Sequence, residues 1–185
     1  MINIGIIAGG GNLPIAIGSN LIKKNYNVFF FVIDEFFNNI NYKGCNVTLI
    51  NLKSAKVIIN SLKAKNIDSI IMAGNIKRPS ITDLNFDFQT FKLAKNLLLN
   101  KTGDNSLLVS IKKYFTDNGF DYFDWKEHCQ ELFANNNDLT KLKPTKKAKE
   151  NLKKALSIFK SFGELDVGQS MIIQNQIVLG LEAVE

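Results

Sequence analysis

The sequence is poor in cysteine and histidine, and each shortage excludes a class of protein. The two cysteines, Cys45 and Cys129, are far apart, so they form neither a disulfide framework nor a zinc-binding pattern, and they suit a reducing compartment. The one histidine, His128, has no acidic or nucleophilic partner at a catalytic spacing, and we interpret it as a surface or boundary residue. No Walker loop, Ser-His-Asp pattern or histidine cluster for a metal is present.

Long apolar segments are also lacking. The longest run, VFFFVI, is much too short to span a bilayer. The N-terminal MINIGIIAGGGNLP has no basic region ahead of an apolar stretch, so we expect no signal peptide. These features predict a cytoplasmic protein that is at most attached to a membrane surface.

The composition is that of an ordinary globular chain. Of the 185 residues, 45% are hydrophobic and 22% are charged, which suits one domain or one domain plus part of a second. The net charge of +6 comes almost entirely from lysines, which are spread through the chain and form no basic stripe interleaved with aromatics. We therefore expect no nucleic-acid partner. A basic surface would still favour an anionic substrate or anionic lipid headgroups.

The first part of the chain alternates strand and helix patterns, which predicts an α/β fold with helices packed on a parallel sheet. The expected strands are Ile2–Ala8, Asn27–Ile33, Val47–Leu52, Asp68–Ala73 and Phe120–Phe123. The expected helices are Pro14–Lys24, Ser54–Lys65, Phe88–Leu99 and Ser106–Asn118. The second strand does not alternate polar and apolar residues, so we expect it to be buried on both faces.

The character of the chain changes after residue 133. Residues 134–145 are polar and contain a proline, which predicts a linker between a first domain, 1–133, and a second region, 146–185. Thr145 is expected to cap a helix with a periodic apolar face, made of Ala148, Leu152, Ala155, Leu156 and Phe159. We interpret the lysines of this helix as a solvated face, with membrane contact as the alternative.

A hairpin is expected at the end of the chain, with strands Gln169–Gln174 and Ile177–Val184 joined at Asn175-Gln176. The chain stops at Glu185, at the end of a strand. Because a lone hairpin is marginally stable in water, we expect 146–185 to be the incomplete beginning of a second domain.

Two glycine-bearing segments follow predicted strands. In IIAGGGNLP, residues Gly9, Gly10, Gly11 and Asn12 lie between a strand and a helix, where backbone N–H groups can bind a phosphate. Pro14 departs from the dinucleotide-binding fingerprint, so a tight turn needed only for packing remains the alternative. The acid that ends the second strand, Asp34, is placed where a carboxylate could bind a ribose hydroxyl.

The second segment, MAGNIKRPS, holds the one arginine of the chain. Gly74, Asn75 and Lys77 lie beside Arg78, directly after the strand that ends at Ala73. A guanidinium binds phosphate or carboxylate through two parallel hydrogen bonds, which lysine cannot reproduce. Since open α/β sheets bind ligands at the carboxyl ends of their strands, these residues are candidates for substrate binding, with chance retention of a single arginine as the alternative.

Two further segments combine glycine with polar side chains. In KTGDNSLL, Asp104 follows Gly103 and either caps a helix, orients a substrate hydroxyl or ligates a hard cation. In GELDVGQSMIIQ, Asp166 and Gln169 form a polar turn into a strand, which is a site candidate or turn chemistry alone.

Taken in order, IIAGGGNLP, MAGNIKRPS, TGDNSLL, LDVGQSMIIQ and VLGLEAVE resemble the LpxI-type UDP-2,3-diacylglucosamine pyrophosphatases of lipid A synthesis. The resemblance implies a Rossmann-like N-terminal domain joined to a second α/β domain, with the substrate between them. It implies hydrolysis of the UDP-sugar lipid to UMP and lipid X, with Mg²⁺ as cofactor, in the cytoplasm at the inner face of the cytoplasmic membrane.

Members of this family continue beyond the AVE ending with a Gly-Thr-Asp turn, and the aspartate identified with catalysis lies in that continuation. The resemblance therefore implies that this chain is the N-terminal two-thirds of such an enzyme and inactive alone, with no catalytic residue or metal ligand assigned within it. The expected substrate-binding residues are Gly9, Gly10, Gly11, Asn12, Gly74, Asn75, Lys77, Arg78, Gly103, Asp104, Asp166 and Gln169.

Two other functions stay open at this point. The glycine loop and Asp34 also suit a nicotinamide- or flavin-dependent oxidoreductase, and a gene that ends at Glu185 would suit a non-catalytic nucleotide-binding module. The sequence leaves the acyl-chain preference undecided, and a homodimer remains open.

Overall fold

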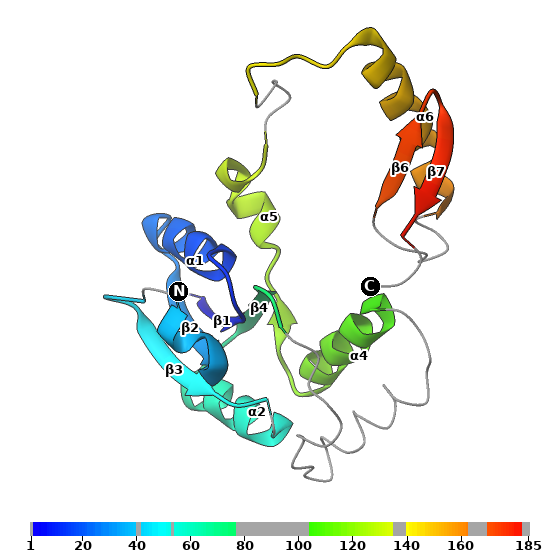
Figure 1. Ribbon diagram of the computed structural model, residues 1–185. Coiled ribbons are helices and arrows are strands. Elements are labelled where there is room, and N and C mark those ends of the chain that lie inside the picture. Colours follow the sequence, from blue (N-terminus) through cyan, green and yellow to red (C-terminus); the bar gives the residue numbers. More distant parts are fainter. Residues whose placement is uncertain are drawn as a thin grey trace. The chain divides into compact units, whose positions relative to one another are not determined.

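The computed structural model describes residues 2–39, 42–52, 54–76, 104–134, 140–162 and 170–182. The chain divides into two compact units, one of residues 1–99 and 110–133, the other of residues 100–109 and 134–185. The expected helix Phe88–Leu99 lies outside the described residues. The elements are β1 (Asn3–Ala8), α1 (Leu13–Lys23), β2 (Asn27–Ile33), η1 (Asp34–Asn39), β3 (Asn46–Ile50), α2 (Ala55–Ala64), β4 (Ser69–Ala73), α4 (Asp104–Asp117), β5 (Asp121–Tyr122), α5 (Trp125–His128), η3 (Gln130–Leu132), α6 (Lys146–Phe162), β6 (Met171–Gln174) and β7 (Ile177–Leu181), shown in Figure 1.

The first unit is built on a five-stranded parallel sheet with the strand order β3-β2-β1-β4-β5. The chain runs from β1 outward to β2 and β3, and it then returns to β4 on the other side of β1. This order gives a Rossmann-like sheet whose topological switch point lies between β1 and β4. The expected α/β class is confirmed.

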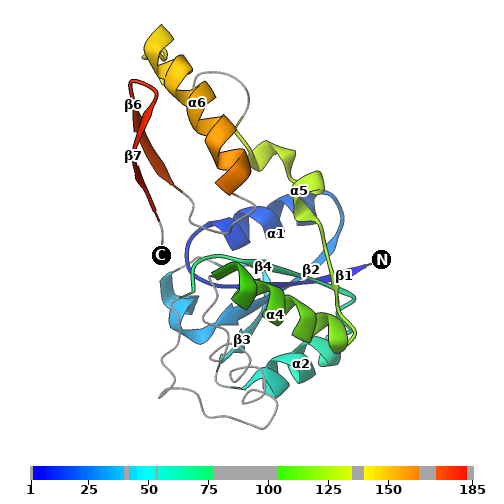
Figure 2. The same ribbon diagram turned by 90° about the vertical axis from the view of Figure 1, so that its right-hand side faces the viewer.

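The sheet is covered on both faces (Figure 2). On one face, Ile17 and Leu21 of α1 pack with Ile6 and Phe30. On the opposite face, strand residues pack with residues of α2, of α4 and of the loops before β4 and β5. This second core is made of Ile7, Phe31, Ile33, Ile50, Ile58, Ile59, Leu62, Ile67, Ile70, Phe115 and Phe120. Because β2 contributes to both cores, its apolar run does not alternate, as expected from the sequence.

Local chemistry fixes where the helices begin and end. The Ser54 hydroxyl accepts a hydrogen bond from the backbone N–H of Val57 and caps α2. After α1, Asn25 adopts a φ of +64°, a left-handed conformation that ends a helix. Strand β2 has the expected bounds, and β1, β3, β4, α1 and α2 lie within two residues of theirs. Helix α4 begins at Asp104, two residues before the expected start.

In the second unit, the helix and the hairpin expected from the sequence are both present. The Thr145 hydroxyl accepts a hydrogen bond from the N–H of Ala148 at 3.1 Å, which confirms the predicted cap of α6. Strands β6 and β7 are joined by Asn175 and Gln176, whose φ angles are +51° and +62°. A two-residue loop with positive φ at both positions is a type I′ turn, whose twist matches that of the strands.

The apolar face predicted for α6 is only partly buried. Ala155 and Phe159 are half-buried, whereas Leu152 and Leu156 are 58% and 61% exposed. The hairpin packs on a side of the helix that includes Asn151, whose side-chain oxygen accepts a hydrogen bond from the N–H of Gln176 at 2.8 Å. The periodicity predicted the helix correctly, but the packed side is rotated away from the two leucines.

The contact between Gly18 and Phe30 gives the first testable prediction. A Cβ atom at Gly18 would overlap the fully buried Phe30 ring. We expect Gly18→Ala to lower the free energy of unfolding by about 1–3 kcal/mol, although alanine alone favours a helix over glycine by about 1 kcal/mol. Urea unfolding measures this change. The control Ser19→Ala alters an exposed position of the same helix and should change stability by less than about 0.5 kcal/mol. A Gly18→Ala variant more stable than the parent would contradict the contact.

Candidate functional site

The loops after β1 and β4 meet at the carboxyl edge of the sheet. Gly10 and Asn75 form an isolated antiparallel bridge in which each backbone N–H donates to the other's carbonyl, at 2.8 and 2.9 Å. A third bond runs from the N–H of Gly9 to the carbonyl of Ala73 at 2.9 Å. The structure therefore joins the two glycine segments that the sequence singled out, at the switch point where open α/β sheets bind ligands.

Three of the glycines in these loops are required by close packing. A Cβ at Gly9 would overlap the carbonyl of Asn75, and a Cβ at Gly74 would lie 2.7 Å from the carbonyl oxygen of Gly10. A Cβ at Gly10 would lie 2.9 Å from the ring of Phe36 in η1. For these positions the packing alternative explains the glycine without a ligand.

Gly11 is different. Its φ is +86°, which favours glycine, yet no atom would lie within 4 Å of an added Cβ. Gly11 and Asn12 are exposed. The surface at Gly11, directly before α1, is therefore open.

The N-terminus of α1 has no side-chain cap. Asn12 occupies the N-cap position without forming a capping hydrogen bond, and no acidic residue lies in the first turn. Within the described residues, the N–H groups of Gly11, Asn12 and Leu13 have no hydrogen-bond partner. Open N–H groups and the positive end of the helix dipole favour an anion at this position.

Asp34 lies at the same edge, after β2. Its exposed carboxylate accepts hydrogen bonds from the N–H of Glu35 at 2.9 Å and from the side-chain amide of Asn51 at 2.8 Å. Asn51 follows β3, so the ends of two strands together orient the carboxylate. The sequence reasoning missed Asn51, although its position directly after a strand could have indicated it. It also missed Phe36, whose ring packs against Gly10. No sequence pattern indicates this contact.

The remaining predicted site residues are not placed. Lys77, Arg78, Gly103, Asp166 and Gln169 lie outside the described residues, and so does the side chain of Asp104. The described part of the site therefore consists of Gly9, Gly10, Gly11, Asn12, Gly74 and Asn75, with Asp34 beside them.

The two cysteines and the histidine lie in surroundings typical of packed residues rather than of catalytic groups. Burial raises the pKa of the Cys45 thiol and of the Cys129 thiol, so neither is an activated nucleophile. The half-buried His128 ring stacks on Phe123 at 4.8 Å between centroids, and its Nδ1 lies 3.2 Å from the Tyr26 hydroxyl. These contacts fit the boundary position expected for His128.

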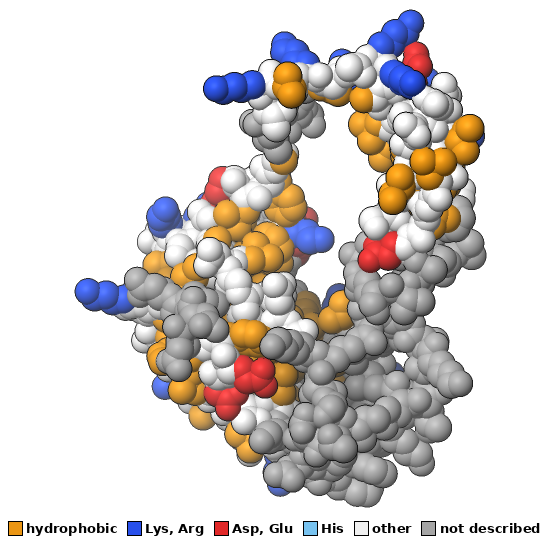
Figure 3. All heavy atoms as spheres, viewed as in Figure 1, with side chains coloured by type: hydrophobic (Ala, Val, Ile, Leu, Met, Phe, Trp, Pro, Cys, Tyr) orange, Lys and Arg blue, Asp and Glu red, His pale blue; other side chains and the backbone are white. Residues whose placement is uncertain are grey.

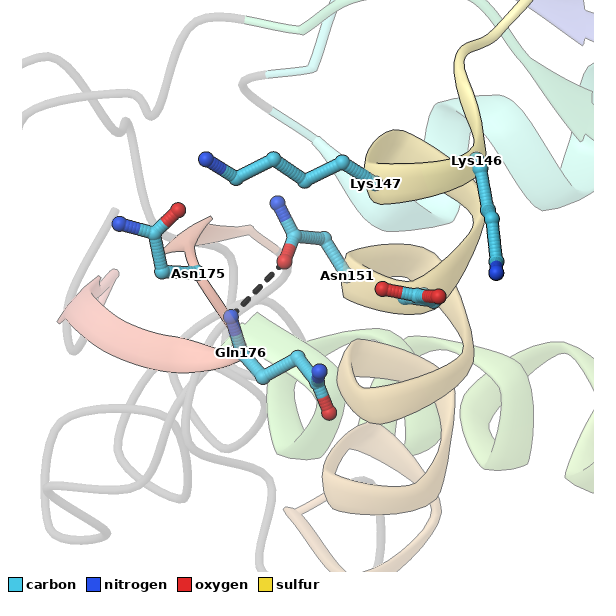
Figure 4. Close-up of a pocket in the computed structure, with 6 residues that line it drawn as sticks. Lys146, Lys147, Asn151, Asn175 and Gln176 are labelled. Atoms are coloured by element: carbon cyan, nitrogen blue, oxygen red, sulfur yellow. Dashed lines mark hydrogen bonds between the residues drawn. The ribbon is translucent and has the colours of Figure 1, made fainter.

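A concavity lies in the other unit, between the first turns of α6 and the hairpin turn (Figure 4). It measures about 500 Å³ and is lined by Lys146, Lys147, Glu150, Asn151, Asn175 and Gln176. The Asn151–Gln176 hydrogen bond crosses it. The pocket is open and polar, and its charged lining consists of one carboxylate and two lysines.

The described ranges contain neither a candidate metal centre nor a helix that could span a membrane. No three His, Cys, Asp or Glu side chains in the described part of the chain come together as metal ligands. None of the described helices is long and apolar enough to cross a membrane.

The strand order, the bridged loops and the open helix start define a Rossmann-like α/β protein with its candidate site at the switch point. The model of the LpxI N-terminal domain matches residues 3–132, and the model of the LpxI C-terminal domain matches residues 135–185. The chain belongs to the LpxI family. It is 28% identical, over 188 aligned residues, to the UDP-2,3-diacylglucosamine pyrophosphatase LpxI of Caulobacter vibrioides. The alignment covers all of this chain and 66% of that relative, so the chain spans just under two thirds of the relative's length.

The two kinds of glycine in the site predict different costs of substitution. Gly74→Ala combines a φ of +95° with a backbone overlap, and we expect it to lower the free energy of unfolding by about 3 kcal/mol. Gly11→Ala has only the positive φ, and we expect a loss of about 1 kcal/mol. The control Gly44→Ala has the same open surroundings at a φ of +81° and should behave like Gly11→Ala. Equal losses for Gly74→Ala and Gly11→Ala in urea unfolding would show that the loops do not touch.

Proposed function

We propose that the protein hydrolyses the pyrophosphate bond of UDP-2,3-diacylglucosamine, releasing UMP and lipid X. The observation that supports this most directly is the match of both LpxI domain models, in order, along nearly the whole chain. The name of the Caulobacter vibrioides relative agrees with it. The activity is proposed for the complete protein, which we place in the cytoplasm, peripheral to the inner membrane.

The open start of α1 supports a phosphate subsite in the first unit. The N–H groups of Gly11, Asn12 and Leu13 would donate to phosphate oxygens, and the helix dipole adds a favourable potential. During hydrolysis a water oxygen bonds to one phosphorus while the bridging oxygen leaves with the other phosphate. Negative charge grows on these oxygens, and pre-oriented N–H donors stabilise it. We propose that Arg78 acts on the same diphosphate through its two-pronged guanidinium.

We further propose that Asp34 binds the ribose of the nucleotide. Its carboxylate is exposed, oriented by Asn51 and placed one strand away from the glycine loop. A carboxylate at the end of the second strand of such a sheet is suited to accept hydrogen bonds from ribose hydroxyls.

A requirement for Mg²⁺ is proposed from the family resemblance alone. The described residues contain no group of three or more His, Cys, Asp or Glu side chains that could hold the ion.

The activity is tested by release of UMP from detergent-dispersed UDP-2,3-diacylglucosamine. We expect turnover by the complete translated product of the gene in the presence of Mg²⁺, loss of turnover with EDTA, and recovery when Mg²⁺ is restored. The 185-residue chain is assayed in parallel for binding of UMP. A folded complete protein without turnover would refute the proposal, and saturable micromolar binding of NAD(H) would favour an oxidoreductase instead.

Asp34 is tested by nucleotide affinity. Asp34→Asn should weaken UMP binding at least about tenfold, because a hydrogen bond to a charged group contributes roughly 1.5–3 kcal/mol. It should leave the affinity for 2′,3′-dideoxy-UMP unchanged, since that ligand lacks the hydroxyls. Isothermal titration calorimetry gives both values. Asp121→Asn, an exposed acid at β5, serves as the matched control. Equal losses for the two nucleotides would remove Asp34 from the ribose site.

A further inference from the structure

The side chain nearest to Gly10 in the glycine loop, residues 9–12, is the ring of Phe36. An added Cβ at Gly10 would lie 2.9 Å from Cδ1 and 3.1 Å from Cε1 of this ring, whereas the carbonyl oxygen of Asn75 would lie at 3.6 Å. The φ of Gly10 is outside the positive range that favours glycine. The Phe36 ring, rather than the backbone conformation, therefore requires glycine at position 10.

The same short helix, η1, carries both Phe36 and Asp34. The Asp34 carboxylate accepts a hydrogen bond from the side-chain amide of Asn51 at 2.8 Å, so the start of η1 is tied to the end of β3. Phe36 lies two residues further on, less than one turn of a 3-10 helix. One fixed turn thus holds the carboxylate at the edge of the sheet and presses a ring against the glycine loop.

Beyond this ring, the loop has few restraints. The bridge to Asn75 fixes the backbone of Gly10, but Gly11 has a φ of +86° and no atom within 4 Å of an added Cβ. Glycine has more backbone freedom than any other residue, so a ligand that bound a loose glycine loop would have to order it. A ring that limits the movement of the loop lowers this cost before the ligand arrives.

We propose that Phe36 is a positioning residue of the nucleotide site. This inference rests on the proposed function, in which N–H groups of the loop and of α1 bind a phosphate and Asp34 binds the ribose. The Phe36 ring acts through its contact with Gly10. It sets the spacing between the loop and Asp34, so that the phosphate and the ribose of one nucleoside phosphate reach both at the same time.

The surroundings of Phe36 favour a supporting role over stacking on the base of the nucleotide. The ring is half-buried, and it packs against the second core as well as against Gly10. Its neighbour Phe37 is exposed and stacks on Tyr42, with 6.3 Å between ring centroids. The helix exposes Asp34 and Phe37, and Figure 3 shows acidic and hydrophobic side chains next to each other on the visible face of the first unit.

The first measurement is the affinity of the complete protein for UMP by isothermal titration calorimetry. Phe36→Ala should weaken UMP binding at least about tenfold, since restoring the freedom of one backbone residue corresponds to about five- to thirtyfold in affinity. Phe36→Leu keeps bulk against Gly10 and should recover most of the loss. The matched control Phe37→Ala removes the adjacent ring and should change the affinity less than about threefold.

A second ligand separates positioning from contact with the base. Ribose 5-phosphate has the ribose and the phosphate of UMP but no base. If Phe36 sets the spacing between the loop and Asp34, Phe36→Ala should weaken ribose 5-phosphate by the same factor as UMP. A loss confined to UMP would make Phe36 a stacking surface for the base and overturn the positioning role.

A double-mutant cycle with Asp34 gives a readout that a merely structural residue would not move. Two contacts to one ligand reinforce each other only while their spacing is fixed, so the effects of the two substitutions should be coupled. Asp34→Asn, which weakens UMP at least about tenfold in the parent, should weaken it less than about threefold in the Phe36→Ala background. In the Phe37→Ala background it should keep its full effect.

The contact itself is tested without any ligand. Gly10→Ala should lower the urea midpoint of the parent, because the new methyl group overlaps the Phe36 ring. In the Phe36→Ala background the same substitution should leave the midpoint unchanged, since the ring is gone. Equal shifts of the midpoint in both backgrounds would show that the ring does not support the loop.

The outcomes distinguish this proposal from the proposed hydrolysis. Turnover of UDP-2,3-diacylglucosamine together with additive losses in the cycle would leave the activity in place and remove Phe36 from the site. Binding of UMP with the predicted coupling, but without turnover, would support Phe36 and refute the hydrolysis. A folded parent that does not bind UMP would overturn the nucleotide site and, with it, the role of Phe36.

Discussion

Two backbone hydrogen bonds between Gly10 and Asn75 hold the ends of β1 and β4 together, and the candidate site depends on them. Such a close approach leaves no room for side chains at Gly9 and Gly74, so the glycines follow from the backbone geometry rather than from a ligand. Once the loop is fixed, Gly11 turns the chain into α1 and leaves the first N–H groups of that helix exposed. The glycines at the Gly10–Asn75 bridge are thus explained by packing. The exposed N–H groups at the start of α1 are the part of the site that is available for an anion.

The sequence predicted the first unit well because its physical signals are local. Unbroken apolar runs gave β1, β2 and β4, and Ser54 marked the start of α2. The meeting of the two glycine segments was also predictable, since parallel strands end at the same edge. The Asp34–Asn51 contact was not, because it depends on β2 and β3 being neighbours in register, which no local pattern reveals. The positions of Lys77 and Arg78 remain predictions.

In the second unit, periodicity predicted a helix but not the side that packs. A face of Ala148, Leu152, Ala155, Leu156 and Phe159 is consistent with the spacing, yet the hairpin lies against a side marked by the polar Asn151. The hydrogen bond that Asn151 accepts from the turn is exposed, so it orients the hairpin on the helix but contributes little to the free energy of folding. Hydrophobic spacing carries no information of this kind, so the exposed leucines became visible only in the structure.

The contact of Gly18 with Phe30 has a consequence for how distant substitutions reach the site. Helix α1 is about 16 Å long, and Gly18 lies roughly 7.5 Å along the axis from its first residue. Helix α1 lies directly on the Phe30 ring at Gly18, and Ile17 and Leu21 pack into the same core. Because this core is closely packed, a change in the bulk of residue 30, deep in the sheet, would move the helix and with it the N–H groups at its open end. Anion affinity would then vary with a side chain that never meets the ligand.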